Sequence, residues 1–374
     1  MLDNAFGVIY TGENSISLKD LTYSRAVAAV PVGGRYRAID FLMSNLVNSG
    51  ITNVGVITQR NYHSLMDHLG AGKEWDLNRK RDGLFILPPF VTRENTGFYR
   101  GTADALKGIM GYIRRSSQRY CIFMGSHTIY NTAYDDAIGA HIESGADITM
   151  FYDVKAEPES DDFFERIYMT MDDTGRVTDV EVNPFAPSTQ NVSMDCYILE
   201  KNLLEYLVEE CVSHSHYDFV RDIIMAKLKE LRVFGYEHKG YVGRIDSLLG
   251  YYKLNMDLLE NEVRNDIFSE KYPVYTKVKD EVPAMYGNNV RAQHSIVADG
   301  CIVEGNIENC VLFRNVHIAP GATLKNCIVM QACEVQENAA LENVILDKAV
   351  LVKRERRLVG QPTFPIIIRK NSIV

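Results

Sequence analysis

The sequence predicts an α/β domain with a mostly parallel sheet, followed by a C-terminal left-handed β-helix of hexapeptide repeats. Over residues 1–261, strand-like runs alternate with amphipathic helical patterns, which is typical of a parallel sheet covered on both faces. From residue 289 to 374, aliphatic residues recur every six positions, a period that fits neither an α-helix nor an alternating strand. The length of 374 residues suits two domains.

The alternation in the first domain can be followed in short segments. Residues 38–50 (AIDFLMSNLVNSG) have apolar side chains at helical spacing and a glycine stop, so they predict an early helix. The run 53–58 (NVGVIT) predicts a strand before the amphipathic segment 61–69. The run 120–125 (YCIFMG) predicts a further strand, followed by a helix that ends at Gly145.

The interior of the β-helix is predicted from three aliphatic runs with six-residue steps, between which Gly or Asn recurs. Each short strand would form one wall of a triangular coil, with its aliphatic side chain stacked inside. Ordinary short strands with chance spacing are the alternative. The segment 262–288 carries prolines and charges without a period, so it is expected to be a linker. The three runs are Val290, Ile296 and Ile302; Leu312, Ile318, Leu324 and Met330; and Val329, Val335 and Leu341.

Composition excludes several classes of function. The chain is 46% hydrophobic and 24% charged, as expected of a globular protein, and no run approaches the ~20 apolar residues of a membrane span. A net charge of −9 argues against nucleic acid or an anionic membrane as partner. The start of the chain shows no secretory signal, and the seven cysteines lack C-x-x-C spacing. We therefore expect a reducing, cytoplasmic location and no structural metal.

The turn after the first predicted strand raises a question about phosphate binding. A phosphate loop needs small residues and usually a basic side chain. Residues 11–18 (TGENSISL) offer one glycine and the acid Glu13. From these residues alone, a working site, a degraded site and an ordinary turn all stay open.

Motifs along the whole chain carry a family resemblance. The segment 21–51, with its GGRYR and IDF runs, FYRGTADA at 98–105, and IVADGCIVEGNIENCVLF in the tail resemble bacterial glucose-1-phosphate adenylyltransferases. The resemblance implies a Rossmann-like (GT-A-like) nucleotidyltransferase domain that joins ATP to glucose 1-phosphate, giving ADP-glucose for glycogen synthesis. It also implies that the β-helix helps to assemble a tetramer.

This sequence departs from the family pattern where that pattern supplies cations and metal ligands. The glycine-rich loop with its arginine is missing at 11–18, and the family's lysine after Arg-Ala is Val27. The two metal-binding acids correspond to Ser126 and Tyr241. Magnesium prefers hard oxygen ligands, for which serine and tyrosine are poor replacements. Asp246 or Asp135 could replace a missing metal-binding acid only if its position were shifted by several residues along the chain.

The sugar-phosphate side of the family's site is also altered. The lysine of its Glu-Lys-Pro motif corresponds to Asn183. Residues retained from the pattern are interpreted either as a vestigial substrate site or as scaffold: Tyr99, Gly101, Asp104 and Ser193. We expect no cofactor in this chain, with Mg²⁺ and ATP bound by a catalytic partner.

Three functions are compatible with these residues. The first is a non-catalytic, GlgD-type regulatory subunit that forms a hetero-oligomer with a homologous catalytic subunit. The second is a weakly active nucleotidyltransferase, or one with altered specificity. The third, a hexapeptide acyltransferase, lacks support, because only His294 and His317 in the repeats could act as a base and neither has an evident acid partner.

A regulatory subunit needs an effector site, which the family resemblance places near the domain junction for anionic metabolites. Candidate cations for such a site, or for subunit contacts, are Arg25, Arg35, Arg37, Arg354 and Arg356. Solvated charges and interchain salt bridges are the alternative.

Overall fold

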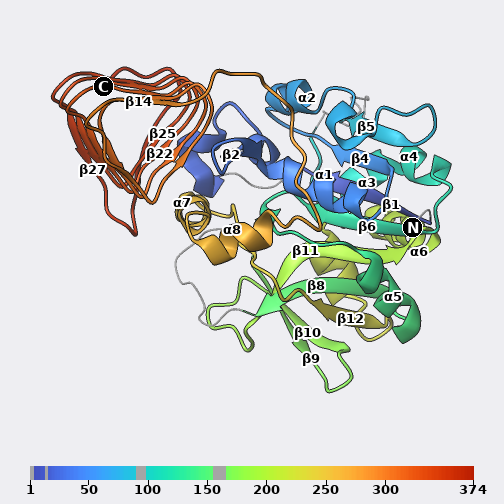
Figure 1. Cartoon of the computed structure of the whole chain (residues 1–374). Coiled ribbons are helices and arrows are strands. Elements are labelled where there is room, and N and C mark those ends of the chain that lie inside the picture. Colours follow the sequence, from blue (N-terminus) through green and yellow to red (C-terminus); the bar gives the residue numbers. More distant parts are fainter. Residues whose placement is uncertain (1–3, 13–15, 90–97, 155–165) are drawn as a thin grey trace.

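The computed structural model of the chain describes residues 4–12, 16–89, 98–154 and 166–374, and shows an α/β domain followed by a triangular β-helix (Figure 1). Within the described residues, the first domain has a nine-stranded sheet. Its parallel part has the order β6-β1-β4-β5. Strand β11 runs antiparallel to β6 and connects it to the remaining strands. The strands are β1 (Ala5–Tyr10), β4 (Asn53–Ile57), β5 (Gly83–Leu87), β6 (Tyr120–Gly125), β8 (Ile148–Val154), β9 (Ile167–Met171), β10 (Val177–Val182), β11 (Asn191–Glu200) and β12 (Val233–Glu237).

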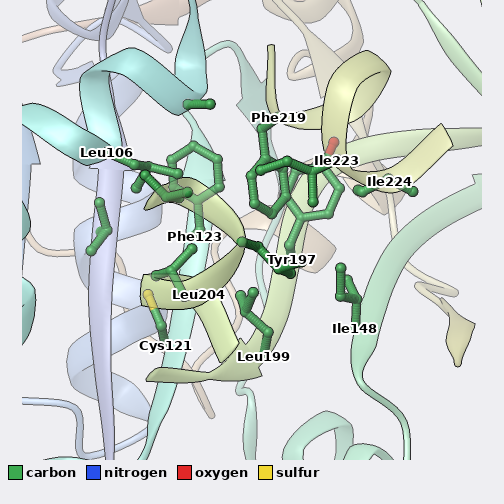
Figure 2. Close-up of a cluster of buried hydrophobic side chains, with 14 of the residues drawn as sticks. Leu106, Cys121, Phe123, Ile148, Tyr197, Leu199, Leu204, Phe219, Ile223 and Ile224 are labelled. Carbon is green, nitrogen blue, oxygen red and sulfur yellow. The ribbon is translucent and has the colours of Figure 1, made fainter. Parts of the chain in front are cut away.

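Helices cover both faces of this sheet, as the alternating pattern predicts. Along β1, Phe6 and Val8 join one core cluster while Ala5 and Ile9 join another, because successive side chains of a strand point to opposite faces. Figure 2 shows the first cluster, in which Phe219 packs against Phe123 and Tyr197. The helices are α1 (Ala38–Asn48), α2 (His63–Leu69), α3 (Thr102–Gly108), α4 (Met110–Arg115), α5 (Asp135–Ser144), α6 (Lys201–Ser213), a π-helix (Phe219–Met225), α7 (Leu248–Asp257) and α8 (Asn261–Ile267).

Shorter elements connect these layers. Short 3₁₀ helices span Ile16–Thr22, Val27–Ala29 and Lys73–Trp75. Two small antiparallel pairs are β2 (Pro31–Val32) with β3 (Tyr36–Arg37), and β7 (Thr128–Ile129) with β13 (Gly243–Arg244). The β2–β3 turn faces the β-helix, and Gly34, with φ +79°, lies there against Leu312 and Ile296.

Residues 285–374, all of them described, form three parallel five-stranded sheets that are the walls of the β-helix. The first wall is β14 (Met285–Tyr286), β17 (Ile302–Val303), β20 (His317–Ile318), β23 (Glu334–Val335) and β26 (Leu351–Val352). The second is β15 (Ala292–Gln293), β18 (Asn306–Glu308), β21 (Thr323–Lys325), β24 (Ala340–Glu342) and β27 (Arg357–Val359). The third is β16 (Ile296–Val297), β19 (Val311–Leu312), β22 (Ile328–Val329), β25 (Val344–Leu346) and β28 (Ile366–Ile368).

The structure corrects the predicted interior of the β-helix at three positions. Val311 pairs with Ile328 and Ile328 with Ile345, so these coils take 17 residues and one of their three steps has five residues. The coil before them is shorter, since Ile296 pairs with Val311, 15 residues later. A six-residue count from Leu324 therefore reaches Met330, one residue late, on the opposite face of the strand. Met330 and Ile296 pack against the first domain, and Ile302 is 37% exposed. The interior positions are Leu312, Ile318, Leu324, Val329, Val335, Leu341, Leu346 and Val352.

The expected linker 262–288 is also more ordered than its composition suggests. It holds most of α8, and its last residues already form β14, so the β-helix begins at Met285. Between them the chain runs along α1, where the Tyr275 N–H donates to Ser44 Oγ at 2.8 Å and Thr276 Oγ1 donates to Asp40 Oδ2 at 2.6 Å. A seven-residue helix and a two-residue strand are too short to show a periodic pattern in the sequence.

The structure also bears on the expectations about membrane spans and cysteines. No helix in the described ranges is long and apolar enough to cross a bilayer. All seven cysteines are buried and have free thiols.

Candidate functional site

A cleft of about 390 Å³ opens at the carboxyl ends of β1 and β6, where parallel sheets commonly bind ligands. Phe123 and Phe219 from the core cluster of Figure 2 line it, together with Gly101 at the start of α3. A Cβ atom on Gly101 would lie 2.3 Å from the Tyr217 carbonyl oxygen, so this position requires glycine. The cleft also contains four arginines and three aspartates: Arg100, Arg166, Arg221, Arg244, Asp195, Asp218 and Asp246.

The turn after β1 is covered by a side chain of the same strand. Tyr10 Oη donates to the Gly12 carbonyl oxygen at 3.0 Å and lies 3.4 Å from Gln59 Oε1. A Cβ atom on Gly12 would lie 2.6 Å from Tyr10 Oη, so the phenol is packed directly on the turn. Glu13 lies outside the described residues. The described part of the turn is closed by protein atoms.

The two positions that correspond to the family's metal acids do not form a magnesium site. Ser126 is buried at the end of β6. Tyr241 Oη donates to Asp257 Oδ2 at 2.7 Å, on the last turn of α7. Over the described ranges, no group of three or more His, Cys, Asp or Glu side chains is placed to hold a metal ion. The donor set does not fit Mg²⁺, which requires several oxygen ligands in octahedral geometry.

Asp246 lies in the cleft, but an arginine binds its carboxylate. Arg166 donates to Asp246 Oδ2 from Nε at 3.2 Å and from Nη2 at 2.8 Å, while Ser247 Oγ contacts the other oxygen at 3.2 Å. Asp135 begins α5 and does not line the cleft. Neither residue is therefore positioned to replace the missing acids without rearrangement.

A second buried ion pair lies beside the first. Arg244 binds both carboxylate oxygens of Asp153, and only 8% and 9% of these two side chains are exposed. Its Nη2 also approaches the Ser193 carbonyl oxygen at 3.4 Å. Arg166 and Arg244 were not predicted as site residues from the sequence. The arginine within the YVGRID run was the one signal that pointed to either of them.

A small pocket of different charge lies where the β2–β3 turn meets the β-helix. Its cavity volume is about 30 Å³, and among the described residues no Asp or Glu lines it. We call it the junction pocket; its basic residues are Arg35, Arg37, His68, Lys277, Lys279, Arg314 and Lys348.

Arg314 is the most unusual of these residues. It is 8% exposed, and its Nε and Nη2 atoms are buried without a hydrogen-bond partner. Burial, with a contribution from Arg35, lowers the pKa of Arg314 below its ordinary value. A buried donor group without a partner is uncommon in folded proteins and indicates a place for a ligand or ordered water.

Two carboxylates near the junction pocket are occupied by other groups, while Asp299 and Glu281 act on Arg314 through their charge alone. Asp347 accepts from Arg25 Nη2 at 2.7 and 3.0 Å, in an ion pair that is almost fully buried. Asp40 accepts from Thr276 Oγ1 and from the Arg37 N–H, and lies 2.6 Å from His68 Nε2. The pocket therefore has an excess of positive charge and suits an anion.

Both domains of the chain match known protein families. The model of the nucleotidyl transferase family matches residues 6–261, and a GlmU-like C-terminal hexapeptide model matches residues 281–362. A Bacillus subtilis (strain 168) protein named glycogen biosynthesis protein GlgD is 37% identical over 98% of this chain and 96% of its own length. The chain belongs to the glucose-1-phosphate adenylyltransferase family of nucleotidyl transferases.

Other members of the family match over most of their length. Glycogen biosynthesis protein GlgD of Geobacillus stearothermophilus is 36% identical over 87% of this chain and 84% of that protein. A protein named glucose-1-phosphate adenylyltransferase, from Clostridium novyi (strain NT), is 35% identical over 85% of this chain and 83% of its own length. The expected resemblance and fold class are thereby confirmed.

The residues that match the family's substrate site are only partly brought together. Gly101 and Ser193 line the cleft. Tyr99 is buried in the core, and burial raises the pKa of its phenol to about 12, with a further contribution from Asp104. Asp104 accepts from the Arg100 N–H at 3.0 Å and does not line the cleft. Asn183 has φ +52° and is exposed outside it.

The remaining predicted positions separate into core, junction and surface. Val27 is 1% exposed within the core, so no cation replaces the family's lysine at this position. Arg35 and Arg37 line the junction pocket, whereas Arg25 is buried in its ion pair with Asp347. The structure does not bring Arg354 and Arg356 to the pocket. Both are exposed between β26 and β27, and neither lines the pocket.

Proposed function

We propose that this chain is a regulatory, catalytically deficient subunit of glucose-1-phosphate adenylyltransferase in bacterial glycogen biosynthesis. It would act in the cytoplasm, in a heterotetramer with a homologous catalytic subunit that binds Mg²⁺ and ATP. One observation carries the proposal. The two metal positions hold Ser126 and Tyr241, and the acid nearest to replacing them, Asp246, is bound by Arg166.

The family comparison supports a pair of related chains. Bacillus subtilis has both a protein named glycogen biosynthesis protein GlgD and one named glucose-1-phosphate adenylyltransferase. This chain is 37% identical to the first and 30% identical to the second. We infer that this chain acts beside a homologous enzyme whose metal site is intact.

The junction pocket supplies a way to regulate such a partner. A phosphorylated metabolite would bind Arg35, Arg37 and Arg314 through charge-assisted hydrogen bonds. Helix α7, which lies beside the β-helix in Figure 1, contacts both sides of the junction. Asn255 Oδ1 accepts from the Gly33 N–H at 3.0 Å, and Tyr252 Oη donates to the Asn326 carbonyl oxygen at 2.8 Å. An anion that fixes this junction would shift the partner's populations through the subunit interface.

The effector site is tested by thermal unfolding of the purified chain with inorganic phosphate or a sugar bisphosphate. We expect either anion to raise Tm, and Arg35→Ala to reduce the shift. Arg354→Ala is the matched control, since it removes the same charge outside the pocket. An unchanged shift in Arg35→Ala would show that the anion binds elsewhere.

A weakly active or altered-specificity nucleotidyltransferase is the second candidate, favoured by the open cleft that keeps Gly101 and Ser193. It is distinguished by measuring Mg²⁺-dependent pyrophosphate release from the chain alone. The regulatory proposal predicts release at background level. Steady, Mg²⁺-dependent release by the wild-type chain, changed little by Ser126→Asp with Tyr241→Asp, would overturn it.

A further inference from the structure

Lys348 occupies a special place among the basic residues of the junction pocket. It follows β25 on the side of the β-helix that faces the first domain, and it is half-buried. Groups from several separate elements surround it. These are Arg25 before the Val27–Ala29 helix, Arg35 and Arg37 of the β2–β3 hairpin, His68 of α2, Lys277 and Lys279 of the interdomain segment, Arg314 after β19, and its neighbour Asp347.

No carboxylate of the described residues forms an ion pair with the Lys348 ammonium group. The nearest, Asp347, is bound on both oxygens by Arg25, and its Oδ1 also accepts from the Lys348 backbone N–H at 2.7 Å. Asp40 is bound by Thr276 and by the Arg37 N–H, and contacts His68. An ammonium group at this point meets mainly repulsion and desolvation.

The lysines described in the pocket can relieve this repulsion by losing a proton, whereas its arginines cannot. Guanidinium groups keep their proton at any physiological pH, whereas a lysine ammonium loses its proton when it is desolvated or placed beside other cations. Burial, followed by Arg37 and Arg25, lowers the pKa of Lys348 to about 7. The charge of the pocket can therefore change in the pH range of a bacterial cytoplasm.

We propose that anion binding in the junction pocket is coupled to protonation of Lys348, so that the pocket takes up one proton together with a dianion. The inference rests on the proposed role of this pocket as an effector site. It adds that the effector and pH act on the same residue.

The direction of the pH dependence follows from linkage. Without an anion, Lys348 carries its proton below pH 7 and loses it as the pH rises. A bound dianion stabilises the ammonium form, so the bound state holds the proton to higher pH. Affinity is then greatest below pH 7 and falls by up to about tenfold per pH unit above it, until Lys348 also deprotonates in the complex.

Inorganic sulfate is a suitable probe, because it stays a dianion throughout this range while phosphate itself titrates. Sulfate binding to the full chain would be measured by calorimetry between pH 6.5 and 8.5, in two buffers with different enthalpies of ionisation. The wild-type chain should bind more weakly as the pH rises, and should take up protons on binding near pH 7.5. Lys348→Arg keeps a permanent charge, so it should bind sulfate with neither pH dependence nor proton uptake.

The outcomes separate this inference from the proposed function. If sulfate does not bind at any pH, the effector site fails and the proton coupling fails with it. If sulfate binds with the same affinity across the range, or if Lys348→Arg keeps the wild-type pH dependence, the coupling is wrong and the effector site stands. A wild-type pH dependence in Lys348→Arg would mean that Lys348 is not the group that takes up the proton. A wild-type Tm for Lys348→Arg without sulfate would confirm that its fold is intact.

Discussion

The cleft and the junction pocket both gather several arginines, but they balance this charge differently. In the cleft, Arg166 is bound to Asp246 and Arg244 to Asp153, so cations and acids of the chain neutralise one another. In the junction pocket, Arg314 has buried nitrogen atoms without a partner, and within the described residues Arg35 and Lys279 make no ion pair. The difference teaches that an anion site is identified by unbalanced charge, and not by the number of basic residues.

The two arrangements also have different physical consequences. A buried ion pair that keeps both partners holds the backbone around it, and is costly to break on one side only. A buried cation without a partner destabilises the free chain and favours any ligand that neutralises it. On our proposal, the cleft therefore acts as scaffold in the free chain, and the junction pocket is where an anion binds.

The largest change in the free energy of unfolding is expected when one partner of a cleft ion pair is removed and the other remains. Arg244→Met leaves the Asp153 carboxylate buried without its cation, so the free energy of unfolding should fall by about 3–5 kcal/mol in urea denaturation. The double variant with Asp153→Leu removes both charges and should recover much of this loss. A loss below about 1 kcal/mol in the single variant would mean that the pair is not structural.

The position of the junction pocket depends on the register of the β-helix strands, which two isoleucines can test. Ile318 is fully buried inside the coil, while Ile302 is 37% exposed on the neighbouring strand. Ile318→Ala should lower the free energy of unfolding by about 2–5 kcal/mol, and Ile302→Ala should cost much less. Equal losses would contradict the register that directs Arg314 and Lys348 toward the first domain.

Removing a charge from the junction pocket should raise the free energy of unfolding, whereas removing one from a cleft ion pair should lower it. Arg314→Met removes a buried cation that lacks a partner, and in anion-free buffer it should raise the free energy of unfolding by about 1–3 kcal/mol. The same variant should lose the increase in Tm that sulfate gives the wild-type chain. A lower stability without anions would show that Arg314 makes a favourable contact of its own.

The smallest effect is expected from the basic residues of the last coil. Arg356→Ala changes an exposed side chain outside both sites, so Tm and the sulfate response should match the wild type. A reduced sulfate response would place this residue in the effector site after all.

Local patterns predicted much of this molecule. The helix expected at 38–50 is α1, and the altered metal positions at Ser126 and Tyr241 are visible in the sequence because each lies within a recognisable run. The ion pairs of the cleft were not predictable, since Arg244 meets Asp153 across 91 residues of chain. The junction pocket was missed for a related reason. Arg314 and Lys348 come together with Arg35 only through the length of each coil. Arg354 and Arg356 form a basic cluster in the sequence, but they are exposed and lie outside the pocket.

The regulatory role is tested most directly by mixing this chain with a catalytic homologue that has intact metal acids. Pyrophosphate release would be measured for each chain alone and for the mixture, with and without inorganic phosphate. We expect no release from this chain alone, and a mixture whose kcat, substrate KM or phosphate response differs from that of the catalytic chain. Release by this chain alone at a rate comparable to the homologue, or a mixture identical to the homologue in all three quantities, would contradict the account.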